Sequence, residues 1–264
     1  MRPSGRPVPA RSLWLAAAVG LAVAGPSVVR ADQTVTLYQA YWAGLAAGQI
    51  RLSLADDGGH YRNEIAIRSE GLPHLLIGFR AAAVTEGRLA ASRLPEPAHY
   101  DALYDLKKRR DRRLSMRFIA GGSGVTAERG PEDTSRKPPL DTQFRRNVLD
   151  PLSAMTAIRN ELRHGKRGPF TVPVYDGARR FDVIVRPEAG TRPLLEIEAT
   201  LRPIAGFKGE SSDDGDPENA PRRMVLTFSN DAAMTPLSMT VTVVYMPLVV
   251  ELVERCAPAA RCGW

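Results

Sequence analysis

Apolar and polar residues alternate with a period of two along most of the chain. In residues 49–54 one isoleucine and two leucines share a side, while Gln, Arg and Ser share the other, and residues 61–68 and 113–118 repeat this pattern. Strict alternation is typical of an antiparallel sheet with one buried and one solvated face. Further strands are predicted in the same way at 34–42, 79–90, 98–106, 169–175, 180–186, 194–202, 223–229, 237–245 and 248–254.

One helix is predicted to interrupt the strands, at about 150–164. Asp150 suits the N-cap, Pro151 the first helical position and Gly165 the C-terminal stop. The apolar residues of this segment fall near one stripe and are Leu152, Met155, Ile158 and Leu162. The polar residues that we expect to face away from the core are Arg159, Asn160 and Arg163.

These patterns predict a mainly β fold. About a dozen strands in sequence must curl or close to bury their apolar face. We therefore expect a curled antiparallel meander, an open or spiral barrel-like sheet, that wraps the helix at 150–164. Segments 121–140 and 209–221 are rich in Gly, Pro and charged residues, which predicts mobile loops.

The first 31 residues have the order of a secretory signal. A segment with arginines and no acid precedes the apolar run 13–25, and Val29-Arg30-Ala31 resembles a cleavage site. We expect cleavage after Ala31, which leaves residues 32–264 as one β-rich periplasmic domain without a transmembrane span. The alternative is an uncleaved anchor, but the apolar run is shorter than the ~20 residues that span a bilayer.

Removal of this segment changes the meaning of the charge. The full chain has 36 Lys plus Arg against 29 acids, a net charge of +7 and a pI near 9.7. Cleavage removes Arg2, Arg6, Arg11 and Arg30 and no acid, which lowers the net charge by four, from +7 to +3. Such a mild charge does not indicate a nucleic-acid partner. We expect a monomer.

Both cysteines, Cys256 and Cys262, lie near the C-terminus. In an oxidising compartment they are expected to form a disulfide, with free thiols as the alternative. Closing so short a loop contributes only about 2 kcal/mol in the entropic model, so the bridge would order the tail rather than the core.

No arrangement of residues indicates catalysis. The sequence lacks the G-x-S-x-G motif of a serine nucleophile and a phosphate-binding glycine loop, and its four histidines are scattered without metal-ligand spacing. We therefore predict a protein that is not an enzyme and has no cofactor and no metal. An envelope hydrolase built from distant residues is kept as an alternative.

Two features are candidates for binding. Large apolar and aromatic side chains on a curved sheet form a cavity for an apolar ligand, or else ordinary core, and the candidates are Tyr41, Trp42, Phe79, Tyr100, Tyr104, Met116, Phe118 and Met155. A basic stretch at 107–113 suits an anionic partner such as lipid headgroups or acidic glycans, or else forms a solvated hairpin turn. Its candidate residues are Lys107, Lys108, Arg109, Arg110 and Arg112.

Several short motifs resemble those of domain-of-unknown-function family 3108. They are Val148–Met155 (VLDPLSAM), Ile158-Arg159, Val174–Gly177 (VYDG), Phe228–Asp231 (FSND) and Pro236-Leu237. The resemblance covers roughly 35–254 and implies an exported, envelope-associated, β-rich domain with no catalytic residues to transfer. The acidic segment 209–221 and the cysteine tail have no counterpart in these motifs.

Together these observations favour a noncatalytic periplasmic protein that contributes to cell-envelope maintenance by binding an apolar or amphipathic envelope component, such as a lipid, in the curved sheet. The alternative is an interaction scaffold that docks on an anionic partner through the basic stretch.

Overall fold

Alternating side chains produce long β-strands in the computed structural model, which describes residues 32–89, 94–107, 109–131, 139–188, 194–207, 220–243 and 245–256. All of these residues belong to one compact unit, Ala31–Trp264. The strands are β1 Asp32–Trp42, β2 Leu45–Asp56, β3 His60–Ser69, β4 Arg80–Leu89, β5 Pro95–Leu106, β6 Arg109–Ile119, β7 Gly124–Gly130, β8 Phe170–Tyr175, β9 Arg180–Pro187, β10 Leu194–Ala205, β11 Arg222–Ser229, β12 Pro236–Val243 and β13 Met246–Cys256.

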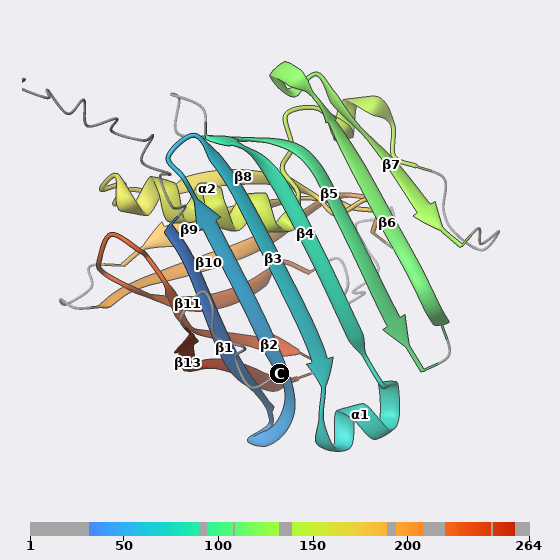
Figure 1. Cartoon of the computed structure of the whole chain (residues 1–264), viewed down its shortest axis with the longest axis vertical. Helices are drawn as coiled ribbons and strands as arrows, with labels where there is room; N and C mark the ends of the chain where they lie inside the picture. The colour runs from blue at the N-terminus through green and yellow to red at the C-terminus, as the bar shows by residue number, and fades with distance from the viewer. Residues whose placement is uncertain are drawn as a thin grey trace, which may run out of the picture. The chain divides into compact units, whose positions relative to one another are not determined.

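In the described part of the chain, 13 strands form a single open sheet in the order β7-β6-β5-β4-β3-β2-β1-β13-β12-β11-β10-β9-β8 (Figure 1). Strands β1 to β7 form one meander, which we call the first wing, and β8 to β13 form the second wing. The two wings meet where β1 pairs with β13 in antiparallel register, from Val35↔Cys256 to Trp42↔Leu248. The predicted mainly β, barrel-like antiparallel fold is confirmed.

Within the residues that the structure describes, two α-helices and two 3-10 turns connect the strands. They are α1 Gly71–Ile77, η1 Ala120–Gly122, η2 Thr142–Arg145 and α2 Pro151–Arg163. Helix α1 joins β3 to β4 at one end of the sheet (Figure 1). None of the helices in the described ranges has the length and apolar character of a membrane span.

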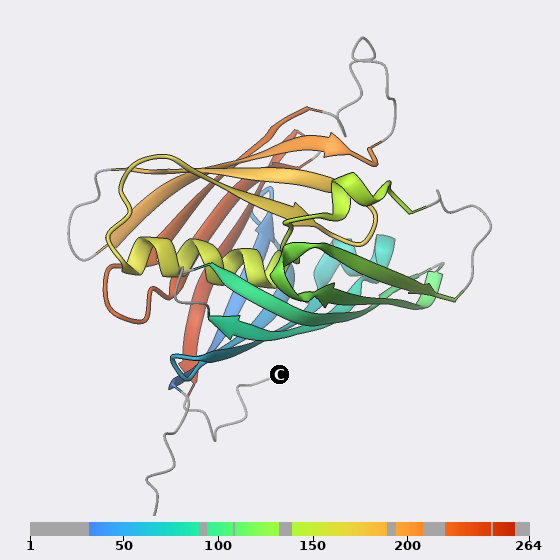
Figure 2. The same ribbon diagram turned by 90° about the horizontal axis from the view of Figure 1, so that it is seen from above.

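Helix α2 forms where the sequence predicts it and packs between the two wings. It contacts β3, β4 and β5 of the first wing and β8 of the second, so the sheet curls around it (Figure 2). Its apolar side belongs to the largest core cluster, in which Ala157 and Leu162 are fully buried against Val174 and Phe228 of the second wing. The helix therefore fills part of the space enclosed by the curled sheet.

The prediction of a loop over 121–140 is wrong for Gly124–Gly130, which form β7. This strand pairs with β6 from Ile119↔Gly124 to Arg113↔Gly130. Val125 is 3% exposed and packs in one cluster with Tyr100 and Met116, so a short alternating segment is enough to complete the wing. Residues 132–138 and 208–219, which include most of the predicted loop at 209–221, lie outside the described residues.

Candidate binding site

Asp150 caps the first turn of α2 from inside the core. Its Oδ1 accepts hydrogen bonds from the backbone N–H groups of Leu152 and Ser153, both at 2.9 Å. Its Oδ2 accepts from the hydroxyl of Thr85 on β4 at 2.9 Å and from the hydroxyl of Ser153. Asp150 is fully buried, and burial raises the pKa of its carboxyl although these hydrogen bonds act in the opposite direction. One side chain thus both starts the helix and ties it to the first wing.

Two side chains of β3 extend this network. The Tyr61 hydroxyl lies 2.7 Å from Ser153 Oγ, and Asn63 Nδ2 donates to Thr156 Oγ1 at 2.5 Å. Burial, together with the nearby Asp150 carboxyl, raises the pKa of the Tyr61 phenol, which keeps it neutral at ordinary pH. The side chains that form these hydrogen bonds are all buried, so this network positions the helix.

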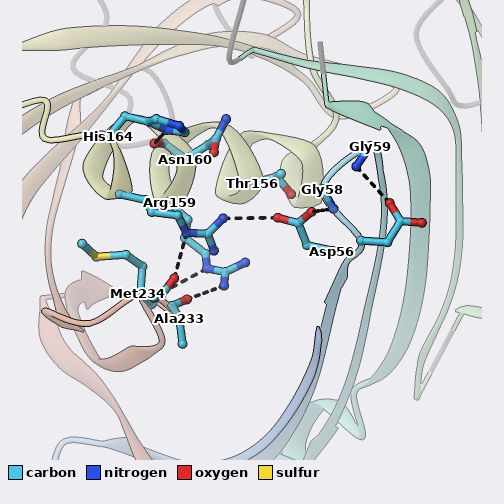
Figure 3. Close-up of polar contacts among 12 residues, drawn as sticks. Asp56, Gly58, Gly59, Thr156, Arg159, Asn160, His164, Ala233 and Met234 are labelled. Atoms are coloured by element: carbon cyan, nitrogen blue, oxygen red, sulfur yellow. Dashed lines mark hydrogen bonds and ion pairs between the residues drawn. The ribbon is translucent and has the colours of Figure 1, made fainter. Parts of the chain in front are cut away.

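The second half of α2 is held by arginines that donate to backbone carbonyls (Figure 3). Arg159 Nε donates to Met234 O at 3.0 Å, and its Nη2 donates to Ala233 O at 2.5 Å. Arg163 Nη1 pairs with Asp56 Oδ2 at 3.2 Å. These bonds join the helix to the β11–β12 connection and to the end of β2.

The expectation that Arg159 and Asn160 face away from the core is wrong, because each is only 7% exposed. An apolar stripe identifies the side of a helix that packs on hydrophobic residues, here the second wing. It does not reveal that the β11–β12 connection supplies the carbonyls of Ala233 and Met234 as acceptors for Arg159, nor that the first wing supplies Asn63 as a polar partner of Thr156.

Beyond α2, the inner face of the first wing is apolar. Side chains alternate between the two faces of a strand, so Ile65 and Ile67 lie on the same face as Asn63, which points to the helix. Cross-strand register extends this face over β2 to β6. We call the half-buried residues on it the inner apolar strip: Ile50, Ile65, Ile67, Ala81, Ala83, Ala102, Tyr104 and Leu114.

The strip runs along two neighbouring cross-strand rows. Ile67 pairs with Ile50 and Ala81. Ala81 pairs in turn with Tyr104. In the row nearer α2, the half-buried strip residues pack against the core cluster that contains the fully buried Met116. In the other row, Ile67, Ala81 and Tyr104 are half-buried and belong to none of the described core clusters. Inward-facing apolar side chains are therefore partly exposed beyond the part of the sheet that α2 covers.

The structure separates the predicted cavity residues into groups. Tyr104 belongs to the strip, and Trp42 lies on the same inner face, paired with Leu248 and half-buried. Tyr100 and Met116 are buried neighbours in a filled core cluster. The others differ: Phe118 and Met155 are partly buried against the core clusters, Tyr41 lies on the opposite face from Trp42 by alternation, and Phe79 immediately precedes β4.

Two hollows are found among the described residues, and the second includes the strip residues Ile65, Ala83, Ala102 and Leu114 in its lining. One, of about 520 Å³, is lined by charged residues such as Glu86 and Arg88 together with Tyr61 and Phe118. The other, of about 600 Å³, crosses β2 to β6 and is lined mainly by outward-facing residues such as Arg51 and Arg113. Both mix charges of opposite sign, so neither favours one class of ligand.

The basic stretch lies at the turn between β5 and β6. Lys107 is exposed and donates from Nζ to Leu75 O of α1 at 3.0 Å. Arg112 is half-buried on β6, in register with Tyr104. Lys108 and the side chains of Arg109 and Arg110 lie outside the described residues.

Cys256 ends β13 and is buried against Val35 of β1. Cys262 lies outside the described residues, so its pairing with Cys256 stays a prediction. Within the described ranges, no group of three or more His, Cys, Asp or Glu side chains is arranged to hold a metal ion.

The family model of DUF3108, described as a protein of unknown function, matches residues 37–252. The chain belongs to this family. No curated protein matches the sequence. Among solved structures, this DUF3108 chain is similar to a beta-barrel-like protein of domain of unknown function DUF1849 from Brucella abortus, with 11% sequence identity and a TM-score of 0.51. The match covers 86% of this chain and 98% of the other, and it supports the fold alone.

Proposed function

We propose that this protein is a noncatalytic binding protein that holds the apolar part of an amphipathic molecule against the inner apolar strip. The supporting observation is that strip residues such as Ile67 and Tyr104 face inward and yet stay half-buried. A completely filled interior would bury them as it buries Met116. Covering an alkyl chain contributes about 0.8 kcal/mol per CH₂ group, so a strip of this kind favours a lipid-like chain.

The predicted export signal at residues 1–31 supplies the setting of the proposal. An exported protein meets lipids and other amphipathic components of the cell envelope, and we infer a role in envelope maintenance in the periplasm.

A catalytic role has less support. Ser153 is the serine closest to a carboxylate in the described core, but it is 0% exposed and is hydrogen-bonded to Asp150, Tyr61 and Thr85. A nucleophile must reach its substrate, and no substrate reaches this hydroxyl without displacing α2. The arrangement therefore favours binding over hydrolysis.

The proposal is tested with the purified, delipidated protein and a dansyl-labelled fatty acid. We expect saturable binding with a blue shift of the dansyl emission. Ile67→Gln places a polar amide in the centre of the strip and is expected to weaken binding by about tenfold, because burying an unpaired amide costs roughly 1–3 kcal/mol. The matched control is Ala66→Gln, which changes the adjacent residue on the outer face of the same strand.

Equal affinities of the two variants would place the ligand elsewhere, and absence of binding to the wild type, with no lipid recovered from the protein by mass spectrometry, would refute the proposal. Circular dichroism of both variants verifies that the sheet is intact.

A further inference from the structure

One end of the sheet exposes large apolar side chains beside cations. The connections at this end are the β1–β2 turn, α1, the β5–β6 turn and the β12–β13 turn, and we call it the α1 end. In α1, Leu72, Leu75 and Leu76 are 51%, 67% and 64% exposed. The neighbouring turns add Leu45 at 59%, Tyr245 at 88% and Met246 at 44%. Single exposed leucines are common, but a group of them at one end marks an interaction surface.

Hydrogen bonds show that these turns are contiguous. Ala43 N in the β1–β2 turn donates to Pro247 O near the β12–β13 turn at 2.9 Å. Glu70 N, just before α1, donates to Ala47 O on β2 at 2.8 Å. Lys107 Nζ of the β5–β6 turn reaches Leu75 O of α1 at 3.0 Å. The exposed apolar residues therefore belong to one connected surface.

Cations border this surface. Arg80, which follows α1, and Lys107 are both exposed, and Lys107 begins the run Lys107-Lys108-Arg109-Arg110 in the sequence. Of the acids at this end, Glu70 pairs with Arg68 at 3.6 Å, whereas Asp105, whose Oδ1 accepts from Asp111 N at 2.7 Å, keeps its negative charge. Asp111 is exposed, so the stretch keeps one acid among its cations.

We propose that the α1 end docks on the surface of an anionic lipid bilayer. Leucine and tyrosine tips suit insertion at the level of the headgroups, and a Lys/Arg border suits the negative surface potential of such a membrane. Acidic proteins or glycans would meet the cations but would leave the leucines in water, so the lipid surface accounts for both features. The proposal goes beyond ligand binding by the strip and does not depend on it.

Docking in this orientation has a geometric consequence for the inner apolar strip. Ile67, Ala81 and Tyr104 lie near the strand ends that meet α1 and the β5–β6 turn, whereas α2 covers the opposite part of the inner face. The strip would therefore open toward the lipid.

The test is sedimentation of the protein without its predicted signal, residues 32–264, with lipid vesicles. We expect it to sediment with phosphatidylcholine vesicles that contain roughly a quarter of phosphatidylglycerol and to stay in solution with pure phosphatidylcholine, and we expect salt to weaken the binding. Leu72→Gln/Leu75→Gln/Leu76→Gln and, separately, Arg80→Glu/Lys107→Glu are each expected to lower the bound fraction by about tenfold.

The matched control is Leu94→Gln/Ile119→Gln, which changes residues that are 53% and 54% exposed at the opposite end of the sheet and is expected to bind normally. The proposal would be overturned if the wild-type protein did not sediment with the anionic vesicles, or if it bound a soluble polyanion but not the vesicles. An equal loss of vesicle binding in the control variant would overturn it too. Ile67→Gln separates the two proposals, because it is expected to keep vesicle binding while its affinity for the fatty acid falls by about tenfold.

Discussion

Asp150 provides the most direct test of how α2 is held inside the curled sheet. Asp150→Ala removes the acceptor of two backbone N–H groups at the start of the helix, which costs about 1 kcal/mol. It also removes the acceptor of the buried Thr85 and Ser153 hydroxyls, which costs about 1–3 kcal/mol for each group left unpaired. Thr85 keeps His99 O as an acceptor and Ser153 keeps Tyr61, so we expect a total near 3 kcal/mol.

At about 2–4 °C per kcal/mol, this loss lowers the melting temperature by roughly 6–12 °C, which thermal unfolding followed by circular dichroism measures. The control is Asp141→Ala, because Asp141 precedes η2 without a capping hydrogen bond from its side chain, and its effect is expected within about 0.5 kcal/mol of zero. A melting temperature for Asp150→Ala as close to the wild type as that of the control would refute the role of the network.

The pH dependence of the free energy of unfolding tests the raised pKa of Asp150. Burial raises the pKa of the Asp150 carboxyl in the folded protein above its unfolded value. The folded chain then holds the proton more tightly, so the stability that this group contributes is complete below the unfolded pKa and is lost as pH rises through the folded pKa. Asp150→Asn cannot titrate, so its deficit relative to the wild type is expected to shrink from about pH 4 to pH 8 in urea unfolding. A constant or growing deficit would contradict the raised pKa.

Two further substitutions test the packing of the sheet and the helix. Arg159→Met leaves the carbonyls of Ala233 and Met234 without their donors and is expected to lower the free energy of unfolding in urea by about 3 kcal/mol. The control, Arg146→Met on the surface, is expected to lower it by less than about 0.5 kcal/mol. Similar losses in both variants would argue against Arg159 as an anchor of the helix. Gly87→Ala places a Cβ 2.4 Å from Glu96 O and 2.6 Å from the Tyr61 hydroxyl oxygen, so β4 and β5 must separate at a cost of about 2 kcal/mol. Gly59→Ala, whose Cβ meets only Asp57 Oδ1 at 3.8 Å, is the control, and an equally small shift of the urea midpoint in both variants would disprove the close approach.

Most strands were predictable because burial on one face leaves a period-two pattern, as in Tyr61, Asn63, Ile65 and Ile67. The helix was predictable from its ends, since Asp150 and Pro151 mark its start without reference to the rest of the fold. Strand β7 was missed because its flanking glycines and charged residues resemble a loop, and Val125 is buried only through contacts with distant residues.

The candidate site was harder to predict than the fold. Large aromatic side chains such as Tyr100 were predicted to line a cavity, but Tyr100 lies in filled core. Much of the strip consists instead of isoleucines and alanines, which are ordinary residues for a strand. Whether such residues are covered depends on where α2 ends. The exposure of the leucines of α1 depends on the place of this helix at the end of the sheet, which the local sequence does not reveal.

The pairing of β1 with β13 has a consequence for how the chain folds. Within the described residues, every other strand pair joins neighbours in sequence, so each wing can form from local hairpins. The seam between the wings must wait for the last strand to be synthesised, and until then β1 offers an unpaired edge that contains Val35 and Leu37. A truncated or slowly emerging chain is thus exposed to wrong edge-to-edge association, and completion of β13 is the event that removes this risk.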